Sequence, residues 1–489
     1  MAMHLFNTLS GREEELQPLE AGHVRMYACG PTVYDYAHIG NFRTFVFMDV
    51  LRRFLQQSGY KLTHVMNVTD VDDKIIQNAA HRGVSVSQYT QKYEQAFFED
   101  MRTLNLERPE VVVRATDHIE DMAAFIRELE QKGFAYRTED GSYYFRIARF
   151  PQYGKLSKKD FAGIEDGARV DVDRYEKDNA RDFALWKSPK PGEASWDTAI
   201  GPGRPGWHIE CSVMAMKYLG ESFDIHLGGE DLIFPHHENE IAQSEAKTGK
   251  PFARIWLHAR FLLVEGEKMS KSLGNFFTLR DLVLKGHRPS ALRYLLASVP
   301  YRKQLNFTFD GLKQAAHSVE RLRTFKERLE RERWPEGTNP AMADLARQTV
   351  EKMRAGLDDD LNTAQALAAI FDLVREANAA ADRGDLKQQD APPLLAALAK
   401  FDEIFAVLTD DDAEKIRRVE EWARAEGVLR EAAPAGQQLT DAQVEALVAH
   451  RQNARRMRDF AKADAIRQQL ADAGIVLEDT KGGVRWKRK

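Results

Sequence analysis

Hydrophobic residues in the first part of the chain follow two different periods. The apolar segment VRMYAC (24–29) runs into Gly30 and Pro31, which is typical of a buried strand that ends in a turn. Residues 42–57 place apolar side chains on one helical face and stop before Gly59, which predicts an amphipathic helix. A second apolar strand, LTHVMNV, begins at Leu62. Strand, helix and strand in this order predict a parallel sheet, which binds ligands beyond the carboxyl ends of its strands.

The middle of the chain, about residues 114–206, has a different pattern. It mixes helical periods with aromatic strands such as SYYFRI and ends in the Pro/Gly-rich segments KSPKPGEASW and GPGRPGW. We interpret it as an insertion in the sheet domain. The alternation then resumes with the strand FDIHLGG, a helix from Pro235, and a strand near RFLLV that leads into GEKMSKSLGN (266–275).

Long helical patterns rich in Ala, Leu, Arg and Glu follow Phe309, and the stretch EAAPAGQQ separates them from a short terminal module. The predicted fold class is therefore α/β, with a Rossmann-like parallel-sheet domain first and helices after it. The expected boundaries are 1–310 for the sheet domain, 311–425 for a helical bundle domain and 440–489 for the terminal module.

Composition narrows the class of protein. With 489 residues, two to four domains are expected, and 43% apolar with 30% charged residues is typical of a soluble globular protein. No run of about 18 uncharged apolar residues could span a bilayer, and the N-terminal segment lacks a secretory pattern. We therefore expect a cytoplasmic protein without a membrane segment. The net charge of −5 argues against indiscriminate nucleic-acid binding but leaves room for a local basic surface.

Two short motifs suggest a nucleotide site. The motif HIGN places His38, Gly40 and Asn41 at a loop-to-helix junction, where glycine lets a flat purine approach and the helix N-terminus favours phosphate. The motif KMSKS puts the ammonium groups of Lys268 and Lys271 on a loop, suited to charge that develops on an α-phosphate. Taken alone, HIGN is also compatible with an ordinary turn, whereas KMSKS is the more specific motif. Together they predict an adenylate-forming site that uses ATP with magnesium.

These paired motifs resemble the signatures of class I aminoacyl-tRNA synthetases. The longer strings CGPTVYDYAHIGNFR, GRPGWHIECS, FPHHENEIAQSEA and GEKMSKSLGN resemble those of the cysteinyl-tRNA synthetase family, from about residue 5 to the C-terminus. The resemblance implies activation of cysteine with ATP, release of pyrophosphate and transfer to the 3′ end of tRNA(Cys) by a monomer. Asn41 departs from the commonest signature, which has a second histidine there, but asparagine can still donate to phosphate.

A metal site is the second candidate. His236 and Glu240 are four residues apart on the helix expected from Pro235, so their side chains share one face. Such a pair is more often a surface pair, but the only two cysteines, Cys29 and Cys211, also lie next to the candidate loops. The family resemblance implies that these four residues hold one zinc ion per chain, with His237 and Glu238 pointing elsewhere. Zinc beside the adenylate pocket would favour the substrate thiolate over the hydroxyl of serine.

The resemblance also implies an amino-acid pocket. It places Thr69, Trp207 and His208 near the cysteine, and Asp231 is a further candidate for the substrate ammonium. Ordinary packing and turn roles remain an alternative for each of these residues.

The C-terminal module carries the expected RNA contacts. Arginines cluster from 451 to 458, and Trp486 lies among basic residues near the end, where its ring could stack on an unpaired base. A solvated helix face is the simpler explanation of such a cluster. The family's anticodon-binding module occupies this position, and Arg455, Arg458 and Trp486 are the candidate tRNA contacts.

Two alternative functions remain open at this point. One is a ligase of mycothiol synthesis, which joins cysteine to an amino sugar with the same zinc and adenylate machinery but lacks an anticodon module. The other is a non-catalytic tRNA-binding relative, in which HIGN, KMSKS or the ligand set would be lost. The complete C-terminal region and the intact motifs argue against both.

Overall fold

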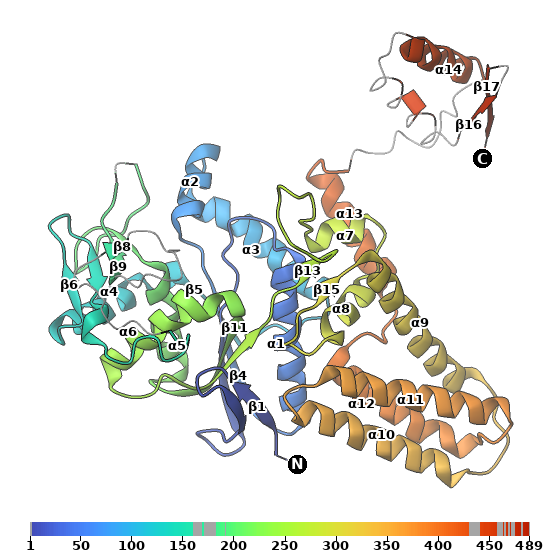
Figure 1. The fold of residues 1–489 in the computed structure, drawn as a ribbon, viewed down its shortest axis with the longest axis horizontal. Helices are drawn as coiled ribbons and strands as arrows, with labels where there is room; N and C mark the ends of the chain where they lie inside the picture. The colour runs from blue at the N-terminus through green and yellow to red at the C-terminus, as the bar shows by residue number, and fades with distance from the viewer. Residues whose placement is uncertain are drawn as a thin grey trace. The chain divides into compact units, whose positions relative to one another are not determined.

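The fold is taken from a computed structural model of the 489-residue chain. It describes residues 2–159, 169–170, 182–190, 192–429, 441–456, 463, 466–467, 470, 475–480 and 483–488. The chain divides into two compact units, Met1–Val419 and Glu420–Lys489, which are described separately below (Figure 1).

A five-stranded parallel sheet forms the centre of the first unit. Its strand order is β12-β11-β3-β4-β5, and every neighbouring pair is parallel. The strands are β3 (His23–Ala28), β4 (Lys61–Val68), β5 (Val111–Arg114), β11 (Phe223–Gly229) and β12 (Ala253–Ala259). The predicted Rossmann-like parallel sheet is thereby confirmed, and its strands end at one common edge.

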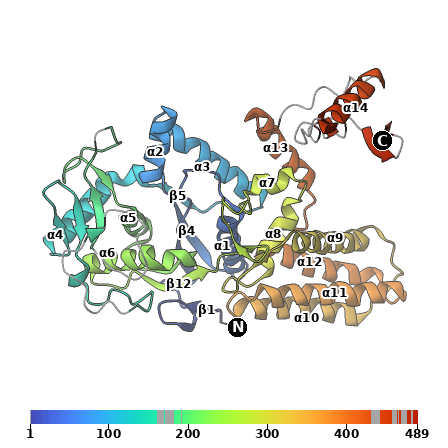
Figure 2. The ribbon, with the colours of Figure 1, turned by 45° about the horizontal axis from the view of Figure 1, so that its top comes forward.

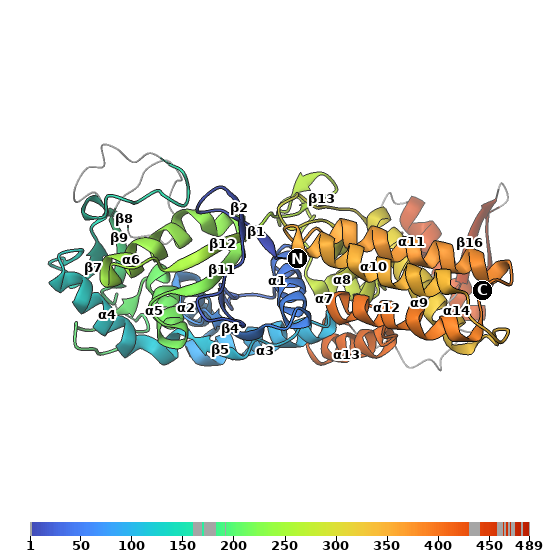
Figure 3. The ribbon, with the colours of Figure 1, turned by 90° about the horizontal axis from the view of Figure 1, so that it is seen from below.

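Helices cover both faces of this sheet (Figures 1 and 3). Helix α1 (Ile39–Gln57) lies on the face to which His64 and Met66 of β4 point. Helix α5 (Trp207–Leu219) packs on the opposite face, against Val65 and its neighbours. Successive side chains of β4 therefore point into two different layers, one on each face of the sheet. Helix α5 belongs to the layer that contains Cys29 and Cys211.

A second, mainly antiparallel sheet is inserted between β5 and α5. Its order is β10-β9-β7-β6, with β8 beside β9. The inserted elements are η1 (Ala115–His118), α4 (Ile119–Gln131), β6 (Ala135–Arg137), β7 (Tyr143–Phe145), η2 (Ile147–Arg149), β8 (Arg169–Val170), β9 (Asp182–Lys187) and β10 (Arg204–Pro205).

Shorter elements connect these layers. They are β1 (His4–Asn7), β2 (Arg12–Glu15), α2 (Asp73–Arg82), α3 (Val86–Thr103), η3 (Glu230–Leu232), η4 (Ile233–His237), α6 (Glu238–Thr248), β13 (Leu263–Val264), β14 (Glu267–Lys268), α7 (Leu279–Leu284), α8 (Pro289–Ser298) and β15 (Asn306–Phe307). The helix expected from Pro235 begins as an α-helix only at Glu238, because Phe234 has an extended backbone inside the preceding π turn η4.

Long helices follow the sheet domain, as the sequence predicts. They are α9 (Phe309–Arg331), α10 (Pro340–Asp358), α11 (Thr363–Asp382), α12 (Ala391–Phe405) and α13 (Asp412–Ala425). Figure 2 shows α9 to α12 running alongside one another. Their buried faces consist mainly of Leu, Ala, Val and Ile at helical spacing, which is the pattern of a bundle.

One buried arginine joins this bundle to the sheet domain. Arg293, which is 1% exposed, donates to backbone carbonyls at the end of α12 and just beyond the end of α3, and to the carboxylate of Asp49 on α1. Carbonyls at helix ends lack partners within their own helix, so a guanidinium that satisfies two such ends fixes both helices together.

The second unit has its own small core. It contains α14 (Asp441–Arg456) and a hairpin of β16 (Ile475–Thr480) and β17 (Gly483–Arg488). Val444, Leu470 and Ile475 are among the buried residues, and half-buried Trp486 packs against them opposite Leu477.

Glu238 anchors the inserted region to α6. Its fully buried carboxylate accepts hydrogen bonds from the backbone N–H groups of Gly154 (2.9 Å), Leu156 (3.1 Å) and Ser157 (2.8 Å). Next to it, the hydroxyl of Tyr153 donates to Asn239. A buried carboxylate of this kind organises a turn that has no regular backbone ladder of its own.

We predict that Glu238→Ala lowers the stability of the first unit. The substitution leaves buried N–H groups without acceptors, at a cost of about 1–3 kcal/mol for each. Thermal unfolding should show a lower midpoint, and limited proteolysis should cut near residues 151–158 first. Asp382→Ala is the control, because it removes an exposed carboxylate paired with Arg328 and should change stability by less than about 1 kcal/mol. Equal midpoints for the two variants would contradict this role of Glu238.

Candidate active site

The four predicted metal ligands converge on the sheet edge. Cys29 follows β3, Cys211 lies on α5, His236 lies on η4 and Glu240 lies on the first turn of α6. Their ligand atoms all lie within 4.8 Å of one another, and all four side chains are buried. The four donors lie in or directly after four elements, of which η4 and α6 are consecutive, so tertiary packing brings them together.

The distances within this cluster are short. Cys29 Sγ lies 3.8 Å from Cys211 Sγ and 3.7 Å from Glu240 Oε1. His236 Nε2 lies 3.0 Å from the same oxygen of Glu240. Two sulfurs, one imidazole and one carboxylate are donors that suit a tetrahedral divalent ion such as zinc. The donor set therefore fits a soft transition metal better than magnesium or calcium.

Charges within the cluster are coupled. Burial opposes ionisation of Cys211, yet the hydrogen bond from Cys29 and the nearby His236 lower its pKa to about 6. Burial likewise opposes ionisation of Glu240, but His226 and His236 lower its pKa to about 2. The pKa of Cys29 is raised, first by burial and then by Cys211. The neighbouring groups thus favour the ionised forms of Cys211 and Glu240, which a bound cation would stabilise further.

Two further histidines belong to this cluster. His226 Nε2 lies 2.7 Å from Glu240 Oε2, and His237 Nε2 lies 3.3 Å from Cys29 Sγ. Together with Cys29 and Glu240 they form a second group of possible metal donors. The expectation that His237 points elsewhere is therefore wrong, because the π turn η4 rotates it toward the cysteine. Glu238 does point away, to the insertion. The inward position of His226 in the strand FDIHLGG was a signal that the sequence analysis did not use.

Two of the four predicted amino-acid residues contact the metal-ligand candidate His236. The indole of Trp207 stacks on the imidazole of His236, with ring centroids 4.2 Å apart. His208 Nδ1 lies 2.9 Å from His236 Nδ1. Thr69, directly after β4, is buried, and its hydroxyl contacts Glu210. Asp231 lies on η3 at the end of β11, and its carboxylate is close to the Cα of Gly229.

His38 and Asn41 form a capping box at the start of α1. His38 Nδ1 accepts from the backbone N–H of Asn41 (3.2 Å), and Asn41 Oδ1 accepts from the backbone N–H of His38 (3.1 Å). Burial lowers the pKa of His38 to about 4, so the ring is neutral near pH 7. Because Nδ1 accepts, the ring proton is assigned to Nε2, which makes His38 a hydrogen-bond donor at a helix N-terminus.

The two nucleotide motifs meet in space. A side chain at Gly40 would collide with His38 Nδ1 (2.9 Å) and approach Met269 of the KMSKS loop (3.1 Å). Lys271 Nζ lies 2.9 Å from Asp35 Oδ2, in the segment that leads into HIGN. Lys268 lies on β14 and is exposed. The fold therefore brings HIGN and the KMSKS loop to one end of α1.

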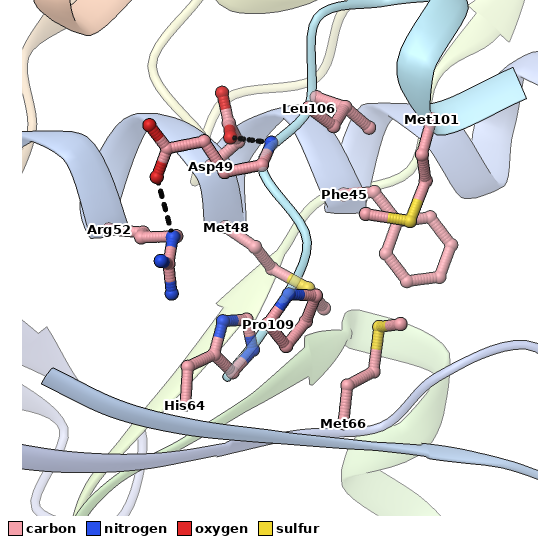
Figure 4. A pocket seen from close by; sticks show the side chains of 10 residues that line it. Phe45, Met48, Asp49, Arg52, His64, Met66, Met101, Leu106 and Pro109 are labelled. Carbon is pink, nitrogen blue, oxygen red and sulfur yellow. Dashed lines mark hydrogen bonds and ion pairs between the residues drawn. The ribbon is translucent and has the colours of Figure 1, made fainter. Parts of the chain in front are cut away.

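A small cavity lies on the other face of the sheet (Figure 4). Residues of α1, β4 and α3 line it, among them Met48, His64 and Met101. Asp49 and Arg52 at its rim are held by the segment after α3, where the backbone N–H of Glu107 donates to Asp49. The cavity is separated from the metal cluster by the sheet and is not part of this site.

The candidate tRNA residues belong to the second unit. Trp486 lies on β17 and is half-buried against the core of that unit. Arg455 lies on α14, but its side chain falls outside the described residues, as does the whole of Arg458. In the part of the chain that the structure describes, no helix combines the length and the apolar character needed to cross a bilayer.

Solved structures share the fold of this chain. Methionyl-tRNA synthetase of Mycobacterium tuberculosis in complex with methionyl-adenylate has a TM-score of 0.57 at 16% identity, over 83% of this chain and 93% of that chain. A leucyl-tRNA synthetase ternary complex of Agrobacterium radiobacter K84 has a TM-score of 0.58 at 12% identity, over 83% and 86% of the two chains. At this identity the likeness concerns the fold alone.

Three family models match successive parts of the chain. The tRNA synthetases class I (C) catalytic domain matches residues 15–317, the DALR domain matches 352–409, and the cysteinyl-tRNA ligase anticodon binding domain matches 438–486. The last match disfavours the amino-sugar ligase, and the catalytic match together with the retained motifs disfavours a non-catalytic relative.

Full-length relatives point the same way. The cysteine–tRNA ligase of Koribacter versatilis is 68% identical over 100% of both chains, and that of Solibacter usitatus is 58% identical over 100% of both. The resemblance inferred from the motifs is thereby confirmed. The chain belongs to the cysteine–tRNA ligase family of class I aminoacyl-tRNA synthetases.

Proposed function

We propose that this chain activates cysteine with ATP to cysteinyl-adenylate, releases pyrophosphate and transfers cysteine to the 3′ end of tRNA(Cys). The observations that carry the proposal are the buried Cys29, Cys211, His236, Glu240 cluster and the contact of the KMSKS loop with the segment that runs from Cys29 to HIGN. The family to which the chain belongs supports it. A charging assay with purified tRNA(Cys), cysteine and ATP tests it directly.

One zinc ion per chain is the proposed cofactor, with Cys29, Cys211, His236 and Glu240 as its ligands. This set is preferred over the group with His226 and His237, because it contains two thiols and zinc binds thiolate strongly. Bound there, zinc would supply a coordination position that favours a thiolate over a hydroxyl. His208 and His226 would orient His236 and Glu240 through their hydrogen bonds.

ATP, with magnesium, is proposed to bind where HIGN and KMSKS meet. Neutral His38 would donate from Nε2 to a phosphate oxygen, and Gly40 would leave room for the purine. Lys268 and Lys271 would stabilise the charge that develops on the α-phosphate. Lys271 must leave Asp35 for this, which is feasible because the pair is largely exposed and therefore weak. Asn41 accepts through its Oδ1 in the capping box, and its NH₂ group could donate to phosphate.

The amino-acid pocket is proposed to contain Thr69, Trp207, His208 and Asp231. Trp207 covers His236 in this structure, so its indole would have to move aside or contact the substrate directly. Asp231 offers a carboxylate for the ammonium of cysteine. Its charge acts on the nearby His38, where it raises the pKa against the larger, lowering effect of burial.

The remaining assignments concern the domains and the RNA. We infer a catalytic domain at 1–310 with its insertion at about 114–206, a helical bundle domain at 311–425 and an anticodon-binding module at 440–489.

Arg455, Arg458 and Trp486 are the proposed tRNA contacts, supported by the basic composition of the last residues. A cytoplasmic monomer is proposed.

We predict that Cys211→Ser lowers zinc content and cysteine activation together. Serine removes a thiolate whose pKa the cluster already lowers, and a neutral hydroxyl binds zinc weakly. Metal analysis of the purified protein should give about one zinc per wild-type chain, and pyrophosphate exchange should fall with the metal. Full exchange activity in a zinc-free preparation would rule out the proposed role of the site.

We predict that Lys271→Ala slows adenylate formation much more than it weakens cysteine binding. Loss of a donor aimed at transition-state charge typically costs about 3–4 kcal/mol, or about 10²–10³ in rate. Pyrophosphate exchange at saturating ATP and cysteine measures it. Asp35→Ala is the matched control, since it frees the lysine but keeps its charge and should retain exchange activity. Unchanged exchange in Lys271→Ala would show that the loop has another role.

We predict that deletion from Thr440 onward leaves cysteine activation nearly intact and impairs charging of tRNA. The proposed adenylate and zinc residues all lie in the unit Met1–Val419, whereas the basic C-terminal residues lie in the other. Salt should weaken tRNA binding more steeply for the full chain, because fewer phosphates are neutralised after the deletion. Equal charging rates for the two forms would contradict an anticodon role of the module.

A further inference from the structure

Glu210 is a buried acidic residue to which the proposed function assigns no role. It precedes Cys211 on α5 and is fully buried. Its Oε2 lies 2.9 Å from the hydroxyl oxygen of Thr69, at the end of β4. A carboxylate without solvent contact must be held by specific hydrogen bonds or ionic contacts, and Thr69 provides one of them.

The hydrogen bonds around Thr69 form a chain in which each donor is defined, from the backbone of Gly30 through Asn67 and Thr69 to Glu210. The backbone N–H of Gly30 donates to Asn67 Oδ1 (2.9 Å), which fixes the orientation of the Asn67 amide. Asn67 Nδ2 then donates to Thr69 Oγ1 (3.2 Å), and Thr69 Oγ1 donates to Glu210 Oε2 (2.9 Å). A hydroxyl has a single proton, so the proton of Thr69 is committed to Glu210. Towards any further partner, Thr69 can only accept.

The loops that hold this chain of hydrogen bonds are fixed next to the metal ligands. The backbone N–H of Thr69 donates to Pro31 O (3.0 Å), and that of Val33 donates to Thr69 O (3.1 Å). Gly30 packs so closely that an added side chain would lie 1.7 Å from the carbonyl oxygen of Asn67. Thr69 is therefore fixed against the loop that begins at Cys29, while Glu210 adjoins Cys211 on the other side.

We propose that Glu210 is a positioning residue that keeps the hydroxyl of Thr69 as an acceptor for the substrate ammonium. The inference rests on the proposed function, since it assumes that cysteine binds beside Thr69. An ammonium group has only donors and a carboxylate only acceptors. A hydroxyl that can only accept a hydrogen bond binds the ammonium group of cysteine and disfavours its carboxylate. The carboxylate is thereby directed toward the α-phosphate of ATP. The buried carboxylate behind the hydroxyl strengthens this preference.

The amide of glutamine would remove this polarity with little change in volume. In Glu210→Gln the side chain can donate to Thr69 Oγ1, which frees the proton of the hydroxyl to point toward the substrate. Thr69→Val removes the hydroxyl while keeping the branched shape, and Thr69→Ser keeps the hydroxyl. If Glu210 acts through the hydroxyl of Thr69, Glu210→Gln and Thr69→Val should weaken binding of cysteine to a similar extent. Thr69→Ser should bind cysteine as the wild-type chain does.

Binding of three thiols to the zinc-loaded full-length chain tests this proposal. Cysteine and cysteamine carry the ammonium, whereas 3-mercaptopropionate lacks it and keeps thiol and carboxylate. We expect Glu210→Gln and Thr69→Val to weaken cysteine and cysteamine by about tenfold, the typical effect of one hydrogen bond to a charged group. Binding of 3-mercaptopropionate should change less than about twofold. The double variant should be no worse than Thr69→Val, because both act through one hydroxyl.

A control variant distinguishes a positioning role of Glu210 from a general effect of the substitution on folding. Lys217→Ala removes an ammonium group that pairs with Asp121 on the exposed side of the same helix α5, and it should keep the zinc content and all three affinities. Loss of zinc in Glu210→Gln, equal weakening of all three thiols, or unchanged cysteine affinity would each overturn the proposal. Pyrophosphate exchange by the wild-type chain reports separately on the proposed function: its absence would refute cysteine activation whatever the thiols show.

Discussion

The buried cluster at the sheet edge imposes the strongest physical constraint on this protein. Two cysteines, a glutamate and several histidines share a space from which water is excluded. Ionised groups are tolerated in such a place only when they neutralise one another or hold a cation. The lowered pKa values of Cys211 and Glu240 reflect that mutual stabilisation. A site of this kind persists because a rigid sheet, α5 and α6 fix each donor before any ligand binds.

One loop at this sheet edge connects the two candidate sites. The loop after β3 begins with Cys29, continues through Asp35 and ends at His38, the N-cap of α1. One segment of ten residues therefore reaches both the buried Cys/His/Glu cluster and the N-terminus of α1, a position that favours phosphate in helices generally. Reactions between an amino acid and ATP need both substrates at one place, and this loop provides the connection.

Contacts remote from the chemistry keep this edge in place. Glu238 ties the insertion to the helix that carries Glu240, through backbone N–H groups that have no ladder partner. Arg293 fixes the ends of α3 and α12 and thereby joins the helical bundle to α1. Both contacts use one charged side chain to satisfy several backbone groups, which is the usual way to stabilise irregular segments in the interior.

The layers, the motifs and the family could be predicted from the amino-acid sequence. Periodicity predicts the βαβ unit and the bundle because burial of apolar faces is a local property, and KMSKS and HIGN are continuous strings. Tertiary structure alone decided which donors meet. The π turn at η4 rotates His237 toward Cys29, and the direction of the hydrogen bonds from Gly30 to Glu210 depends on residues up to 180 positions apart. Local propensity carries no information about such distances, because they are set when the strands and helices pack.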